Sequence, residues 1–198
     1  MTLTPDLLLA LVTFCFATSI TPGPNNMMLL ASGANFGFAR SAPHMLGISL
    51  GFVLMVALVG IGLGRLFDLW PPLETVLTWA SLAYLLWLAV KIARSGEPEA
   101  RAVARPMTFI GAAAFQWVNP KAWGMAMSAT SVYAPDHSLI AALSVALIFG
   151  AVNLPSIALW CLLGVKLRAF LSSATRLRVF NWTMAFLLIV SALPVLWH

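Results

Sequence analysis

Six long apolar stretches, each about long enough to cross a lipid bilayer, occupy most of this 198-residue chain. A helical crossing needs roughly 20 mostly apolar residues to match about 30 Å of hydrocarbon. The stretches lack the alternation of apolar and polar residues that is typical of membrane β-strands, so we predict that they are helices. The predicted spans are Leu7–Ser32, Pro43–Gly64, Leu73–Val90, Met107–Val132, Ser138–Val165 and Val179–Trp197.

The composition excludes a soluble domain. Charged residues make up 9% of the chain and hydrophobic residues 61%, whereas a soluble domain carries about 25% charged residues. Too few polar side chains remain to cover a surface that faces water. No basic segment or small-residue cleavage site marks a signal peptide, so we expect the first span to be retained. We therefore predict an all-α integral membrane protein with one transmembrane domain, residues 1–198.

Basic residues gather in alternate predicted loops. Nine of the eleven Lys and Arg residues lie in loops one, three and five, whereas the opposite side of the membrane holds only Arg65. Cytoplasmic loops concentrate Lys and Arg, so we predict that both termini lie outside the cytoplasm. The net charge of +5 is then a signal of topology, and we expect no nucleic-acid partner. The nine residues are Arg40, Lys91, Arg94, Arg101, Arg105, Lys166, Arg168, Arg176 and Arg178.

The first predicted span contains a segment that a lipid-facing helix does not tolerate. Pro22 and Pro24 each remove a backbone donor, and Gly23 between them permits unusual dihedral angles. Two adjacent polar residues, Asn25 and Asn26, follow directly. Backbone groups freed at membrane depth persist only where they are buried in protein or face a water-filled cavity. The segment therefore predicts a broken helix near the middle of the membrane.

The fourth predicted span contains a second break of the same kind. Asn119, Pro120 and Lys121 follow one another near its centre, and Gln116 lies one turn earlier. The broken spans are then the first members of two three-helix halves. Because three is an odd number, the second half must run upside down relative to the first.

This arrangement predicts two inverted three-helix repeats, each with a broken first helix. Repeat one comprises residues 1–91, a cytoplasmic linker residues 92–106, and repeat two residues 107–198. Inverted repeats with discontinuous helices are found in many secondary transporters, which bind their solute between the breaks at the membrane midplane.

The chemistry of the breaks favours a zwitterionic solute. A half-helix that begins inside the membrane presents free N–H groups and the positive end of its dipole, which attract a carboxylate. Unwound carbonyl groups can hold an ammonium group or a coupling cation, and Asn side chains both donate and accept hydrogen bonds. We therefore predict an amino-acid-like solute. The candidate substrate-binding residues are Thr21, Pro22, Gly23, Pro24, Asn25, Asn26, Gln116, Asn119, Pro120, Lys121 and Asn153.

Lys121 is the only formally charged residue well inside a predicted span. Ionisable residues at membrane depth are functional by default, although Lys121 could instead reach a lipid headgroup or bond the last carbonyls of the broken helix. No acidic residue lies inside a span, so we expect neutral amino acids to be preferred over lysine or arginine. Proton coupling would have to use Lys121 or His44, or else a cation such as sodium would bind backbone carbonyls.

The fifth predicted span carries a weaker break at Asn153 and Pro155. Asn153 could line the cavity or could bond across helices, and the sequence does not decide between the two. In the second span, Gly47 and Gly51 form a small-xxx-small face that lets helices approach closely.

Three motifs together resemble those of the LysE/RhtB family of amino-acid exporters. They are Ser19-Ile20-Thr21-Pro22-Gly23-Pro24-Asn25, the glycine-bearing second span and Asn119-Pro120-Lys121. The resemblance extends over essentially the whole chain, in its length, six-span pattern and central linker. It implies efflux of amino acids or their derivatives from the cytoplasm, driven by an ion gradient, in a bacterial inner membrane, where the basic residues predict that both termini are periplasmic. By resemblance, the residues of the first break up to Asn25 and those of the second break lie on the substrate path.

Other functions fit the sequence less well. A membrane thiol or electron conduit needs cysteines at matching positions of the two repeats, but Cys15 and Cys161 lie in spans one and five. A passive solute pore remains an alternative. No catalytic triad or metal-ligand cluster is visible, so we expect neither an enzyme nor a cofactor. The expected partners are the solute, membrane lipid and a coupling proton or sodium ion, with a homo-oligomer possible.

Overall fold

The computed structural model describes residues 4–95, 105–171 and 173–192, and every regular element within these ranges is a helix. The helices of the first half are α1 (Pro5–Ile20), α2 (Pro24–Phe36), α3 (Phe38–Gly60), η1 (Leu63–Arg65), α4 (Leu66–Leu69) and α5 (Pro72–Arg94). Those of the second half are α7 (Phe109–Phe115), η2 (Gln116–Val118), α8 (Pro120–Tyr133), α9 (Leu139–Leu167) and α10 (Ala174–Ala192). The all-α prediction is therefore confirmed for the described residues.

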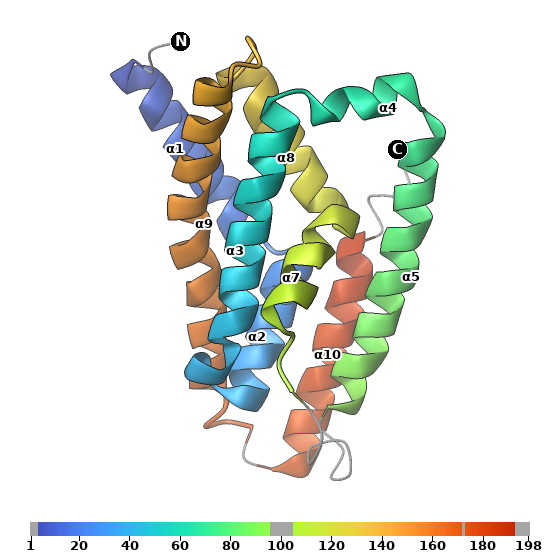
Figure 1. Cartoon of the computed structure of the whole chain (residues 1–198). Coiled ribbons are helices and arrows are strands. Elements are labelled where there is room, and N and C mark those ends of the chain that lie inside the picture. The colour runs from blue at the N-terminus through green and yellow to red at the C-terminus, as the bar shows by residue number, and fades with distance from the viewer. Residues whose placement is uncertain (1–3, 96–104, 172, 193–198) are drawn as a thin grey trace.

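The helices run in alternating directions through one bundle. In Figure 1, α1 and α2 run downward in succession, α3 returns upward, and α5 runs downward. The second half takes the opposite course, with α7 and α8 running upward, α9 downward and α10 upward. Each half thus begins with a helix in two pieces, and the two broken helices run in opposite directions.

Not every predicted span has the length and hydropathy of a membrane-crossing helix. Among the described residues, α3, α5 and α9 are long and apolar enough to cross, and α1 with α2 forms a fourth candidate that is bent by 58°. The fourth predicted span is divided into α7 and α8, which are too short to cross alone. In the sixth, α10 starts at Ala174 and carries two arginines, while the predicted residues 193–197 lie outside the described part.

The predicted start of the second span is wrong for an identifiable reason. The second span was expected to begin at Pro43, yet α3 begins at Phe38 and contains that proline. Gly37 ends α2 and starts α3 with φ of +83°, a left-handed conformation that glycine adopts without strain. The turn is therefore set by Gly37, and α3 tolerates the loss of one backbone hydrogen bond at Pro43.

The expected weaker break at Asn153 and Pro155 is also wrong, because α9 continues without interruption through both residues. A single proline removes one backbone hydrogen bond, whereas each true break contains a segment of extended backbone. Packing against α2 holds α9 together on the far side of Pro155. There Gly164 of α9 lies against the Leu30 carbonyl of α2, and Gly33 of α2 lies against the Cys161 carbonyl of α9.

Close helix approaches at glycine join the two halves. As expected from the small-residue face, Gly47 and Gly51 bring α3 onto α7, at the backbone of Phe109 and Ala113. Small residues let helix backbones approach closely in membranes, where van der Waals packing replaces the hydrophobic effect. The broken helix of each half is therefore packed against the second helix of the other half, α2 against α9 and α7 against α3.

We expect Gly33→Ala to destabilise the protein. The added Cβ would collide with the Cys161 carbonyl oxygen, a backbone atom that cannot rotate away, and overpacking of this kind costs about 1–3 kcal/mol. The matched control is Gly124→Ala on α8, where an added Cβ meets nothing within 4 Å. Thermal unfolding of the purified protein in detergent should give a lower Tm for the first variant alone. Equal Tm values for the two variants would contradict the packing described.

Candidate solute site between two helix breaks

The first break separates α1 from α2 at residues 21–23. Thr21 is extended, with φ of −64° and ψ of 145°, and Pro24 is the first residue of α2. Proline suits this position because its missing N–H is one of those that a helix start leaves unpaired. Thr21 and Pro22 are exposed and Gly23 is buried, where a Cβ would lie 2.7 Å from Cδ of Lys121. Glycine is thus needed here for the close approach of Lys121.

The second break repeats this local structure between η2 and α8. Asn119 is extended, with φ of −91° and ψ of 107°, and Pro120 is the first residue of α8. The Asn119 side chain accepts a hydrogen bond from the Lys121 backbone N–H at 3.2 Å and so caps the new helix. Both breaks therefore consist of extended backbone followed by a half-helix that starts at proline.

The Lys121 side chain connects the second break to the first. Its Nζ donates to the Thr21 carbonyl at 2.8 Å, the Thr21 hydroxyl at 2.9 Å and the Pro22 carbonyl at 3.2 Å. These three acceptors use all three donors of an ammonium group, and a cation is favourable at the C-terminal end of α1. Of the interpretations open from the sequence, the structure shows the bond to the last carbonyls of the broken helix. We call the three acceptors the carbonyl cage.

Amide side chains join the two breaks at a second point. Asn25 donates to Gln116 at 2.9 Å, and Gln116 donates back at 3.3 Å and also to the Ala112 carbonyl at 2.9 Å. Gln116 is fully buried. Asn26 instead bonds within its own half, donating to the carbonyls of Ser19 and Thr21 at the end of α1.

Asn153 combines both of the roles that the sequence left open. Its Nδ2 donates to the Ser19 hydroxyl at 3.1 Å, so it bonds from α9 to α1. Its Oδ1 is buried and has no hydrogen-bond partner among the described residues. The residue also lines a small polar cavity between the breaks.

Side chains from neighbouring helices satisfy other carbonyls that the breaks set free. Trp160 of α9 donates to the Ile20 carbonyl at 3.1 Å. At the second break, Trp123 donates to the Trp117 carbonyl at 2.9 Å, and the Ser81 hydroxyl of α5 donates to the Val118 carbonyl. The carbonyl groups that the breaks leave without a helical partner are thus hydrogen-bonded by side chains of α9, α8 and α5.

The space between the breaks is too small for an amino acid. This polar cavity has a volume of about 20 Å³, which is room for about one water molecule. The predicted residues that line it are Gly23, Asn25, Asn26, Gln116, Asn119, Lys121 and Asn153. The remaining predicted residues, apart from Thr21, face a larger cavity, so the structure brings the predicted set together around this narrow centre.

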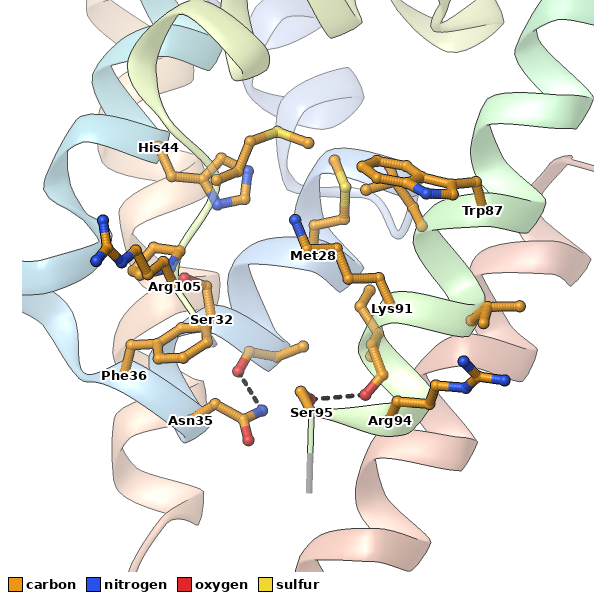
Figure 2. Close-up of a pocket in the computed structure, with 16 residues that line it drawn as sticks. Met28, Ser32, Asn35, Phe36, His44, Trp87, Lys91, Arg94, Ser95 and Arg105 are labelled. Atoms are coloured by element: carbon orange, nitrogen blue, oxygen red, sulfur yellow. Dashed lines mark hydrogen bonds between the residues drawn. The ribbon is translucent and has the colours of Figure 1, made fainter. Parts of the chain in front are cut away.

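Two larger cavities are also present, and the first shares Gly23 and Lys121 with this centre. We call the first the Lys121 cavity; it has a volume of about 620 Å³ and includes Pro22, Pro24, Pro120 and Lys121 in its wall. We call the second the Lys91 cavity; it has a volume of about 540 Å³ and is drawn in Figure 2. Both volumes fall within the roughly 300–1,000 Å³ that is usual for ligand pockets.

Helix α5 borders both cavities. Its first half contributes Glu74 and Ser81 to the Lys121 cavity, and its second half contributes Lys91 to the other. Between these stretches, Tyr84 stacks on Phe115 of α7 with ring centroids 5.4 Å apart. The sequence prediction missed these residues, because nothing in the apolar pattern of α5 indicates which face meets a cavity.

Neither a metal site nor a disulfide is found in the described part of the chain. No group of three or more His, Cys, Asp or Glu residues there could hold a metal ion. Cys15 on α1 and Cys161 on α9 are both free and buried.

Comparisons with known proteins agree with this architecture. The sequence profile of the LysE type translocators matches residues 16–197. A cysteine/O-acetylserine efflux protein of Klebsiella pneumoniae is 31% identical over 196 residues, which cover 98% of each chain. Proteins of the same name from Escherichia coli K12 and Shigella flexneri are 34% identical over 165 residues, 82% of this chain and 84% of theirs. No solved structure matches the chain.

The matched relatives are named as efflux proteins, which are transporters and not enzymes. The family profile covers the helix breaks, both large cavities and all the membrane-capable helices except the start of α1. This chain belongs to the LysE type translocator family and is a membrane transport protein.

Proposed function

We propose that the protein exports small neutral amino acids, or close derivatives of them, from the bacterial cytoplasm across the inner membrane. The observation that carries the proposal is the carbonyl cage, which holds the primary ammonium group of Lys121 through three hydrogen bonds. An amino acid carries the same chemical group at its α-carbon. Cysteine and O-acetylserine, named for the matched relatives, are small amino acids with uncharged side chains, which supports this solute class.

In our proposal the solute exchanges places with Lys121. The ammonium group of the solute takes over the carbonyl cage, and the released Lys121 pairs with the carboxylate of the same solute. Thr21 and Pro22 are exposed, and Pro22 and Lys121 line the Lys121 cavity, so in our proposal the solute approaches the cage from that cavity. Each charge-assisted hydrogen bond that breaks is replaced by an equivalent one, which keeps the exchange energetically balanced.

The exchange selects zwitterions. An amine without a carboxylate would leave Lys121 unpaired in a partly apolar cavity, which is costly. A carboxylic acid without an amine would have no group to place in the cage. Only a solute with both groups restores every interaction.

The charges near the breaks favour uncharged side chains. Among the described residues, Glu74 is the only acidic group that lines either large cavity. Glu74 is exposed at the start of α5, and no Asp or Glu among the described residues lines the small cavity between the breaks, so a lysine or arginine side chain next to Lys121 would have no buried counter-ion there. We therefore propose that neutral amino acids are preferred.

We further propose six crossings arranged as two inverted repeats that expose the site to each side in turn. The opposite courses of the two broken helices in Figure 1 support the inversion. The centre of about 20 Å³ is too narrow for an amino acid, which favours alternating access over a passive pore, since a pore needs a continuous opening. The basic residues at the ends of α5 and α9 and at the start of α10 support a cytoplasmic position for that end and periplasmic termini.

Lys121→Met should reduce export by at least about ten-fold, because it removes charge-assisted hydrogen bonds worth about 1.5–3 kcal/mol each. Cells that lack their own exporters can be loaded with dipeptides of homoserine, leucine or lysine, and the amino acids that leave can be measured. Lys166→Met, which removes an exposed lysine at the end of α9, is the matched control. We expect lysine to leave more slowly than the neutral amino acids. Unchanged efflux in the Lys121 variant would refute a role in transport.

Removing the lysine amine should also open the cage to simple amines. We expect purified Lys121→Met to bind ethylammonium at least about ten-fold more tightly than the unaltered protein, in which Lys121 occupies the cage. The affinity for alanine should fall in the same variant, since its carboxylate loses a partner. Calorimetry in detergent measures both affinities. If the ratio of the ethylammonium affinity to the alanine affinity is the same in the variant and the unaltered protein, the proposed exchange with Lys121 is wrong.

Export should depend on an ion gradient if the protein is a secondary transporter. Proteoliposomes with a proton gradient, a sodium gradient or neither separate the two coupling ions. We expect one gradient to drive uptake of leucine against its concentration difference. Transport that only equilibrates leucine under all three conditions would instead identify a passive pore.

A further inference from the structure

We infer that the Lys91 cavity is a second solute site, which binds the charged head and the apolar side chain of an amino acid on the cytoplasmic side of the breaks. The inference rests on the proposed export function and extends it. The site shares no residue with the breaks, and it lies between α2, α5, the start of α3 and residues 105–107.

The walls of the cavity suit an amphipathic solute. Apolar side chains from three segments face it, including Met28, Trp87, Leu88 and Met107. Polar groups are few, and Figure 2 shows the Lys91 side chain extending from α5 into the space, with His44 on the opposite wall. A mostly apolar pocket with a small number of placed polar groups is the usual form of a small-molecule site.

The charge of the cavity favours a carboxylate. Lys91, Arg94 and Arg105 are among its lining residues, the Lys91 ammonium group reaches into the space while the two guanidinium groups point outward in Figure 2, and no Asp or Glu lines it in the described part of the chain. Lys91 lies 5.1 Å from the centre of the Trp87 ring, so its ammonium group is held over an aromatic face. That contact leaves its N–H donors available to a carboxylate from the cavity.

His44 supplies the second observation that points to a ligand. Its side chain is 2% exposed, and neither ring nitrogen has a hydrogen-bond partner among the described residues. Buried polar groups are almost always paired, and an unpaired one calls for an explanation. A neutral imidazole has one donor and one acceptor, which match the carboxylate and the ammonium group of a zwitterion.

Together these groups define the ligand as an amino acid with an apolar side chain. Lys91 binds the carboxylate of the solute, and His44 forms hydrogen bonds with its carboxylate and ammonium group. The methionine, leucine and tryptophan side chains contact its apolar side chain. The carboxylate then passes from one lysine to another, from Lys91 in this cavity to Lys121 at the breaks.

The test measures Lys91 directly. An uncharged acylating reagent labels the lysines of the purified full-length protein, and mass spectrometry gives the labelling of Lys91 relative to Lys166 in the same molecule. We expect leucine to reduce this ratio several-fold, whereas leucinamide, which lacks the carboxylate, leaves it unchanged. Equal protection by both compounds, or by neither, would overturn the site.

Two variants sharpen the result. His44→Phe keeps an aromatic ring but removes both nitrogens, and we expect it to raise the leucine concentration for half-protection by at least about ten-fold, the effect of losing one good hydrogen bond to a charged group. Unchanged protection in this variant would remove His44 from the site.

Lys121→Met should leave the protection of Lys91 intact, because the two sites are separate. Loss of Lys91 protection in the Lys121 variant would show that leucine acts only at the breaks.

The outcome is distinguishable from that of the export proposal. Protection of Lys91 by leucine in a protein that exports nothing would retain the site and reject export. Export that persists while leucine gives no protection would retain export and reject the site.

Discussion

A helix that is interrupted inside hydrocarbon must find hydrogen-bond partners within the protein, and this requirement governs the structure. The lipid core offers no water to freed N–H and C=O groups. Lys121, Asn26 and Trp160 therefore bond the end of α1, while Ser81 and Trp123 bond the end of η2. The partners come from both halves of the chain. Each break is stable only because the rest of the bundle surrounds it.

The same interactions give the breaks their chemistry. A carbonyl group that is satisfied by a mobile side chain can be satisfied equally by a solute with the same donor. We propose that Lys121 is such a side chain, since it lines a cavity and its ammonium group is matched by the amine of an amino acid. Asn25 and Gln116 hold the two half-helices together more permanently, because both of their amide groups are used and Gln116 is buried. In the proposed exchange, a fixed amide pair and an ammonium group that the solute replaces lie side by side.

Sequence reasoning located the breaks because their cause is local. Pro22, Gly23, Pro24 and the Asn-Pro pair at position 119 alter the backbone whatever surrounds them, and the structure has extended backbone at both places. It failed at Pro155, where the same residue type sits in an unbroken helix. There the outcome depends on packing between α9 and α2, which a single sequence does not reveal.

The sequence did not predict the two large cavities, for a related reason. Glu74, Lys91 and His44 read as residues at helix ends, typical of positions near the membrane surface. Their place in cavity walls follows from how α5 is rotated and what lies opposite it. The sequence also left the role of Asn153 undecided, and the structure shows it both bonding to Ser19 and lining the centre.

The glycine contacts between halves have a consequence for biogenesis. Gly33 of α2 packs against α9, and Gly47 of α3 packs against α7. Both α7 and α9 are synthesised after α2 and α3, so these contacts form only once the second half of the chain has been made. When the ribosome has finished the first three helices, the α2 and α3 surfaces that bear these glycines are still uncovered. Neither half therefore completes its packing alone, and the bundle assembles only after the second half has been inserted beside the first.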